Sequence, residues 1–129
     1  SPLAVAAGLA MLEVVSETTF FEKLQKKTKL LMDGLKERAS AENVPFTTNH
    51  VGGMFGCFFN DAKKVTCLKE VMASNEENFQ IYFHEMLNNG VYLAPSMYEA
   101  GFISAAHTGD EIEKTLNAAT LAFKAINKS

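Results

Sequence analysis

Residues 90–107 read GVYLAPSMYEAGFISAAH, and the rest of the predicted fold is organised around this stretch. Two short apolar runs in it, 91–93 and 102–104, have the β-branched and aromatic content of strands. Between them lie Pro95, whose φ is fixed, and Glu99, a single carboxylate among mainly apolar neighbours. A stiff loop between two strand ends is a common way to present a polar group to a ligand, and an ordinary surface connection is the alternative.

The composition describes a folded domain with a mildly acidic balance. The chain has 129 residues, a hydrophobic fraction of 47% and a formal net charge of -3 at pH 7, which suits one domain with one modest core. Without a basic patch, such a protein has little to offer nucleic acid or an anionic membrane surface, so we expect neither as a partner. No apolar run reaches the roughly 18 residues of a membrane span and no signal peptide is visible, so we expect a cytoplasmic protein.

The cysteines and histidines lack the spacing of metal or redox sites. Cys57 and Cys67 do not form a CxxC pair, and Cys57 lies in an apolar run, so we predict two buried free thiols in a reducing compartment. His50, His84 and His107 show no ligand spacing such as HxxxH, so we predict no metal site. We expect His84 to be buried with a partner or half exposed, and His107 to bond locally.

The opening residues predict a long apolar helix. Ser1 and Pro2 form a good helix start, and the residues after them leave no polar stripe until Glu13. A helix that is apolar on every side must be buried on every side, which one small domain can hardly achieve. We therefore expect residues 1–15 to pack against protein outside this chain, and the absence of Met at position 1 leads us to expect a fragment or a processed product.

A second helix is predicted after a break at residues 16–19. Thr19 and Glu22 form a capping box, and the helix that follows is amphipathic to about Ala39. Its predicted buried side consists of Phe20, Phe21, Leu24, Thr28, Leu31, Met32 and Leu35.

Two runs, 46–51 and 54–59, flank Gly52 and Gly53 and predict neighbouring strands. The second run is apolar on both alternating faces, which predicts cover on both sides. Paired glycines can also cradle a phosphate, but such loops lead into a helix and this one leads into a strand. A turn or bulge with positive φ is the favoured interpretation.

The second half of the chain contains two further helices. Residues 65–73 leave helix and loop open, and a capping box of Ser74 and Glu77 then begins a helix that ends at Asn89 and Gly90. The last helix begins with a capping box of Thr108 and Glu111. The predicted buried residues of these two helices are Phe79, Tyr82, Phe83, Met86, Leu87, Ile112, Leu116, Ala119, Phe123 and Ile126.

The order of elements predicts an α+β fold, a small and mainly antiparallel sheet with helices packed on it. The whole chain, 1–129, is predicted to be a single domain, with 1–15 as a helix of the interdomain type and 16–129 as the compact α+β body.

Three segments carry a resemblance to a known family. The run GVYLAPSMYEAGFISAAHT, with FHEMLNNG before it and GDEIEKT after it, resembles the C-terminal end of the glutamate-1-semialdehyde 2,1-aminomutases, in the class III aminotransferase family of pyridoxal-phosphate enzymes. SPLAVAAGLAMLEVV and VGGMFGCFF are similar to the same family in the same order. The resemblance implies the C-terminal small domain of a fold-type I pyridoxal-phosphate enzyme, a homodimer when intact.

The resemblance also implies a division of labour in the active site. It places the catalytic lysine and the phosphate-binding residues on an N-terminal cofactor-binding domain upstream of Ser1, so the isolated chain should be inactive and should not bind pyridoxal phosphate. It maps the glutamate that faces the reactive side of the cofactor onto Glu99, with Tyr98 and Ser96 as weaker candidates for shaping the substrate pocket. Met97 and Tyr98 stand where glutamine and phenylalanine are more usual.

The implied reaction is the conversion of glutamate 1-semialdehyde to 5-aminolevulinate by intramolecular amino transfer, a step of tetrapyrrole biosynthesis. One alternative is another class III aminotransferase with a different amino donor. Glu99 distinguishes the two, because an arginine supplied by this domain would favour an ordinary transaminase that holds a substrate carboxylate. A second alternative is a free-standing α+β module for ligand binding or protein interaction, which would have no use for an apolar opening helix.

Overall fold

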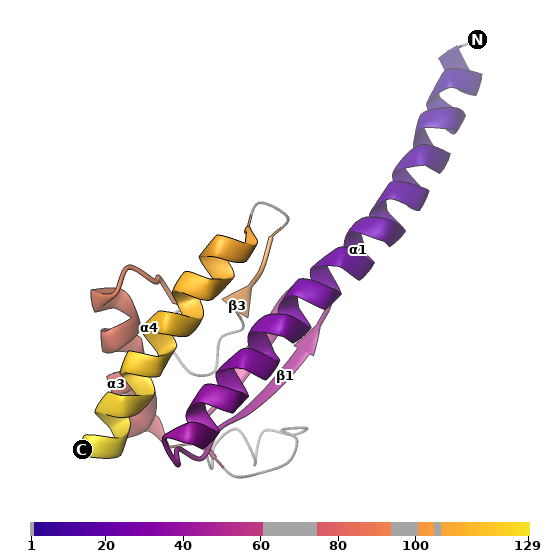
Figure 1. Ribbon diagram of the computed structural model, residues 1–129. Helices are drawn as coiled ribbons and strands as arrows, with labels where there is room; N and C mark the ends of the chain where they lie inside the picture. The colour runs from indigo at the N-terminus through magenta and orange to yellow at the C-terminus, as the bar shows by residue number, and fades with distance from the viewer. Residues whose placement is uncertain (1, 61–74, 94–100, 105–106) are drawn as a thin grey trace.

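The computed structural model describes residues 2–60, 75–93, 101–104 and 107–129, with only the backbone described for residues 2–18. The elements follow one another as shown in Figure 1: α1 (Pro2–Ala41), β1 (Thr47–Val51), β2 (Met54–Phe58), α3 (Glu76–Asn88), β3 (Gly101–Phe102) and α4 (Gly109–Lys128). Cys67 and Ser74, and the segment 65–73, lie outside the described residues.

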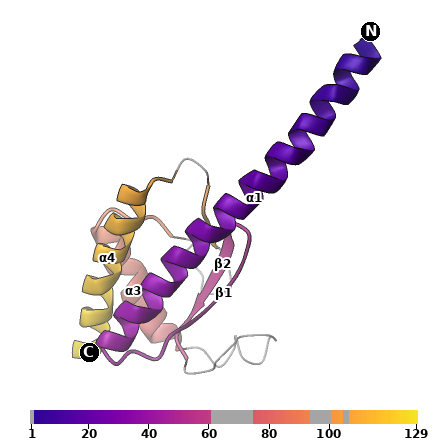
Figure 2. The ribbon, with the colours of Figure 1, turned by 45° about the vertical axis from the view of Figure 1, so that its right-hand side comes forward.

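The described strands form one antiparallel sheet in the order β1-β2-β3, which confirms the α+β prediction and the antiparallel pairing. α3 packs on α4, and α4 and β1 both pack on α1. The C-terminal half of α1 runs beside α4, whereas its N-terminal half extends away from the other elements in both views (Figures 1 and 2).

α1 is one continuous helix of 40 residues, so the predicted break at 16–19 is wrong. That segment contains no glycine or proline, and each serine or threonine there costs at most about 0.7 kcal/mol relative to alanine. This cost is too small to stop a helix that continues on both sides. The long apolar helix of the prediction is therefore not a separate element. Of the predicted buried side, Thr28, Leu31, Met32 and Leu35 are buried, but Phe20 and Phe21 are about half exposed.

The hairpin formed by β1 and β2 turns at Gly52, which has a φ of +58° and confirms the turn that its sequence predicts. The predicted cover on both faces of the second strand is wrong for the described residues. Phe55 and Cys57 pack against the core, whereas Met54 on the opposite face is exposed. Met54 pairs with Val51 and Phe102, which are 65% and 70% exposed, so an apolar row crosses the outer face of the sheet.

α3 begins one residue later than predicted and ends in a way that removes a predicted strand. Its N-cap is Asn75, whose side chain accepts a hydrogen bond from the Asn78 amide. At its C-terminus Gly90 has a φ of +82°, and the Val91 amide donates to the carbonyl of Met86 at 2.8 Å. This is a Schellman cap, and it holds the start of the segment 91–93 at the helix end. The segment forms no strand.

α4 matches its prediction closely. The Thr108 hydroxyl accepts a hydrogen bond from the Glu111 amide at 3.3 Å and caps the helix. The predicted stripe of Ile112, Leu116, Ala119, Phe123 and Ile126 is buried. On α3, the predicted residues Phe79, Tyr82 and Met86 are buried, Phe83 is intermediate and Leu87 is exposed.

The core has an aromatic centre at the end of the molecule where α4 finishes. The ring of Phe46 lies 5.1 Å from that of Phe123 and 5.2 Å from that of Phe59, both edge to face. Tyr82 lies 5.5 Å from Phe123 and 5.3 Å from Phe59. Such pairs stabilise a core by about 0.5–1.5 kcal/mol each beyond their buried area. Among the helices described, none is long and apolar enough to cross a membrane.

Candidate functional site

Ser96, Tyr98 and Glu99, the predicted site residues, lie outside the described residues. The two ends of their loop are described, and both ends border the same cavity. Leu93 precedes the loop and Phe102 follows it, and each lines a pocket of about 340 Å³. The structure therefore places a concave surface at the base of the loop that the sequence singles out.

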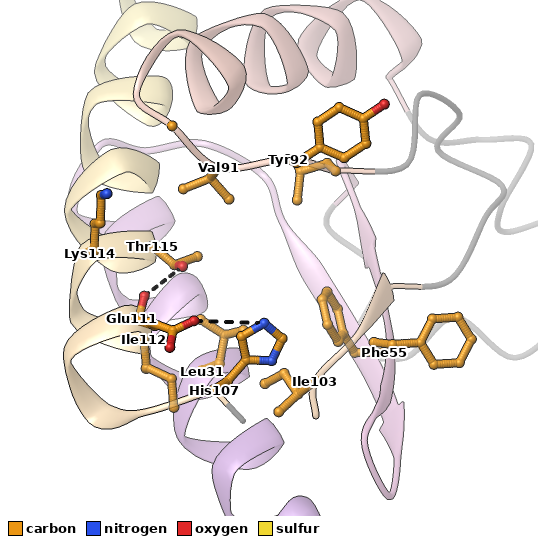
Figure 3. Close-up of a pocket in the computed structure, with 13 residues that line it drawn as sticks. Leu31, Phe55, Val91, Tyr92, Ile103, His107, Glu111, Ile112, Lys114 and Thr115 are labelled. Carbon is orange, nitrogen blue, oxygen red and sulfur yellow. Dashed lines mark hydrogen bonds and ion pairs between the residues drawn. The ribbon is translucent and has the colours of Figure 1, made fainter. Parts of the chain in front are cut away.

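The pocket has an apolar floor and one polar side (Figure 3). Leu31 of α1, Phe55 of β2, and Ile103 and Ile112 supply apolar surface from four separate segments. The polar side is formed by His107 and by the first turns of α4, which contribute Glu111, Lys114 and Thr115. An apolar cavity with a few convergent polar groups is the usual form of a small-molecule site.

Gly101 leaves room for the Phe55 ring where β3 meets the pocket. A Cβ at this position would overlap with Cζ of Phe55, the residue opposite it in the β2–β3 register. The Phe55 ring therefore occupies the space that any other residue at position 101 would need. The pairing of Gly101 with Phe55 holds the end of the predicted loop against the central strand.

His107 makes local contacts, as predicted, and its ring lines the pocket. The Ser104 amide donates to Nδ1 of His107 at 2.9 Å, a hydrogen bond that requires Nδ1 to carry no proton. Nε2 lies 4.0 Å from Oε2 of Glu111, a distance too long for a direct hydrogen bond (Figure 3). The imidazole of His107 and the carboxylate of Glu111 thus lie side by side on the polar side of the pocket.

Cys57 is a free thiol on the inner face of β2. The residue keeps some exposed surface, but burial of the thiol raises the pKa of Cys57 to about 12. Burial, with a smaller contribution from Cys57, also raises the pKa of Tyr82 well above its ordinary value. A thiol with so high a pKa is a poor nucleophile at neutral pH, so we interpret Cys57 as a packing residue of the core and not as a reactive group.

The described residues do not assemble a site for pyridoxal phosphate. Lys114 is the lysine on the pocket wall, and it lies exposed on the first turns of α4. At the N-terminus of that helix, the Glu111 amide is already bound by Thr108. We therefore assign no step of cofactor chemistry to this pocket. His84 is exposed, and no group of three or more His, Cys, Asp or Glu gathers as a metal site within the described part of the chain.

The sequence does not mark His107, Glu111, Lys114 and Thr115 as one group. In the sequence, His107 and Glu111 are recognisable only as parts of a helix start. Their place in a pocket depends on contacts with residues more than 50 positions away, which the sequence does not show. The spacing of Ser104 and His107 is the one local signal, since a side-chain acceptor three residues ahead can close a turn.

The chain shares its fold with part of the aminotransferases that use pyridoxal phosphate. No protein-family model matches the sequence. An omega-transaminase from Sphaerobacter thermophilus aligns with a TM-score of 0.68 and 16% identity, over 86% of this chain and 25% of that chain. A β-phenylalanine aminotransferase from Variovorax paradoxus aligns with a TM-score of 0.67 and 19% identity, over 77% of this chain and 22% of that chain.

A third structure is the FumI protein of Sphingopyxis sp. MTA144 in its pyridoxal-phosphate internal aldimine form. It aligns with a TM-score of 0.67 and 26% identity, over 95% of this chain and 27% of that chain. The chain thus spans about a quarter of the length of these proteins. The neighbours support the aminotransferase level of the resemblance and pyridoxal phosphate as the cofactor of such proteins, and none of the three is named an aminomutase.

Proposed function

We propose that this chain is the C-terminal small domain of a class III pyridoxal-phosphate-dependent aminotransferase and that it forms one wall of the active site of the complete enzyme. The observation that carries the proposal is the match to FumI, which extends over 95% of this chain but only 27% of that one. A cofactor-binding domain in the same polypeptide would supply the reactive lysine and the phosphate site, and the intact enzyme would be a homodimer.

The narrower proposal is that the complete enzyme is a glutamate-1-semialdehyde aminomutase. Its support is the sequence of the loop, in which Glu99 offers a negative charge, whereas many relatives in the resembling family use an arginine from this domain to hold a substrate carboxylate. A carboxylate in that position attracts an ammonium group and repels a carboxylate, so it selects the end of the substrate that faces it. Tyr98 and Ser96 would shape the same pocket.

A substrate panel separates the two levels of this proposal. The full-length enzyme would be assayed with glutamate 1-semialdehyde and, separately, with amino donors that have a distal or a β-amino group. Formation of 5-aminolevulinate without an added keto-acid acceptor supports the aminomutase. Activity that needs a separate donor and acceptor supports another aminotransferase, and no transfer with any pair contradicts both.

Glu99→Gln is the matched variant for the role of the loop. The change keeps the shape and removes the charge, so turnover with the best substrate should fall by about tenfold, the effect of losing one charge contact of about 1.4 kcal/mol. Glu113→Gln, on α4 and exposed, is the control and should leave turnover unchanged. Equal kinetics for Glu99→Gln and wild type would remove Glu99 from the site.

An experiment on the isolated chain tests whether this chain binds pyridoxal phosphate without the rest of the enzyme. Pyridoxal phosphate added to it should give no stoichiometric covalent adduct at one lysine, as judged by absorbance and mass spectrometry. A specific adduct would mean that the chain holds its own cofactor site and would favour the free-standing module.

A further inference from the structure

A lysine on α1 reaches the turn that precedes α4. Nζ of Lys27 donates to the main-chain carbonyl of His107 at 2.7 Å, in a partly buried position and across 80 positions of sequence. Two positions along the same helix, Lys29 instead binds Asp33 at 2.6 Å, and both of these side chains are at least half exposed. Lys27 therefore connects α1 to the turn before α4, whereas Lys29 forms an ion pair within α1 only.

The turn that Lys27 binds is closed by His107 itself. The His107 amide donates to the Ser104 carbonyl at 3.1 Å, and the Ser104 amide donates back to Nδ1 of His107 at 2.9 Å. The second bond requires Nδ1 to be unprotonated. A second proton on the imidazole would therefore break it, and so would a side chain that cannot accept a hydrogen bond.

The other end of the turn is anchored to the sheet. Ile103 is buried, and its amide donates to the Gly53 carbonyl at 2.7 Å. The fit is close, because a Cβ at position 53 would lie 2.6 Å from the Ile103 carbonyl oxygen. Ile103 is thus held by the hairpin, and His107 is held by α1.

We infer that Lys27 and His107 are positioning residues, which set the place of β3 and of the loop end at Gly101 relative to α1. The functional part of this inference rests on the proposed function, because that loop carries Glu99. Neither residue is required to touch substrate. Lys27 binds the main-chain carbonyl of His107, Nδ1 of His107 binds the Ser104 amide, and together these contacts hold one wall of the pocket.

The first test is spectroscopic and does not depend on enzymatic activity. In the full-length protein at neutral pH, long-range ¹⁵N–¹H correlation should show Nδ1 of His107 unprotonated and Nε2 protonated. The Ser104 amide should exchange with solvent about tenfold faster in Lys27→Met and in His107→Ala, since each removes a tie on the turn. A ring protonated on Nδ1, or unchanged exchange in both variants, would overturn the inference.

Conservative variants separate positioning from a general loss of structure. Lys27→Arg keeps a cationic donor and His107→Asn keeps an acceptor near Nδ1, so both should restore slow exchange at Ser104. Lys29→Met, the same change on the exposed face of α1, is the control and should leave this amide unaffected. Faster exchange in Lys29→Met, or no restoration by either conservative variant, would contradict the assignment.

The kinetic test distinguishes this inference from the proposed function. If the full-length protein is an aminotransferase, Lys27→Met should lower kcat/KM by about threefold to tenfold with unchanged cofactor affinity, and Lys27→Arg should recover most of it. If wild type shows no amino transfer, the proposed function fails while the exchange results still decide the Lys27–His107 tie. Normal kinetics combined with faster exchange would overturn the link to the loop.

Discussion

α4 passes through two different environments along its length. In its C-terminal half, Phe123 packs against the rings of Phe46 and Tyr82 and is completely buried. Its first turns border the pocket, where Glu111 and Lys114 are exposed and only Ile112 is buried. One helix thus contributes close packing at one end and a polar cavity wall at the other. We conclude that the aromatic end of α4 contributes more to the stability of the fold, whereas the pocket end supplies polar groups that a ligand could contact.

The largest effect should come from emptying the aromatic end. Phe123→Ala should lower the free energy of unfolding by about 3–5 kcal/mol, because it removes a fully buried ring from a packed cluster. Ile112→Ala, at the pocket end, should cost about 2 kcal/mol, near the lower limit for its type, because one side of that residue already faces a cavity. Urea denaturation monitored by circular dichroism gives both values.

Leu121→Ala is the surface control for this comparison, since Leu121 is 50% exposed on the same helix. It should change stability by about 0.5 kcal/mol or less. An Ile112→Ala variant that loses as much stability as Phe123→Ala would show that the two ends of α4 are packed alike.

Gly101→Ala tests how closely the pocket end is fitted despite its cavity. The new methyl group would collide with the Phe55 ring, so the variant should lose about 1–3 kcal/mol of stability. Phe55→Leu in the same molecule should recover part of that loss, because the shorter side chain vacates the position. A Gly109→Ala variant, whose Cβ would meet nothing within 4 Å, should be tolerated. Additive losses in the double variant would disprove the contact.

The helix caps offer a smaller and more local comparison. Thr108→Ala removes the cap at the pocket end, and Asn75→Ala removes the corresponding cap of α3. Each should cost about 1 kcal/mol, measured by thermal or urea unfolding. Because Thr108 follows His107 directly, only Thr108→Ala should also raise the exchange rate of the Ser104 amide. An equal effect of both variants on that amide would mean that the turn is not a separate unit.

The pH dependence of stability should come from the core side of the sheet. Burial raises the pKa of Cys57 from 9.0 to about 12, so above pH 9 the unfolded chain releases this proton while the folded chain keeps it. The unfolded state then binds fewer protons, and the stability falls as the pH rises between these two values. The raised pKa of Tyr82 acts in the same direction. Cys57→Ala should flatten the curve above pH 9, and an unchanged slope would place its origin elsewhere.

The sequence predicts best those elements whose signals are local. The stripe and cap of α4 are signals within one helix, and the adjacent glycines Gly52 and Gly53 mark the hairpin turn, so both predictions are correct. The break at 16–19 fails because a capping pattern competes with helix propagation, and propagation prevails when no glycine or proline intervenes. The prediction of a strand at 91–93 is wrong because the Val91 amide donates to the Met86 carbonyl in the cap of α3 and is not available to a strand partner.

The pocket could not be predicted from the sequence, for a different reason. Its floor combines Leu31, Phe55 and Ile112, which meet only after three elements have packed together. The loop with Ser96, Tyr98 and Glu99 is a prediction from the resemblance, and the structure contributes the two loop ends and the cavity between them.

The uninterrupted course of α1 has a mechanical consequence. At 1.5 Å per residue its 40 residues form a rod of about 60 Å. Leu31, on the pocket floor, and Lys27 belong to the same rod as the projecting N-terminal turns (Figure 2). Because the helix is continuous, a tilt imposed at its N-terminal end would also move Leu31 on the pocket floor. A force applied far from the cavity would therefore change the width of the cavity.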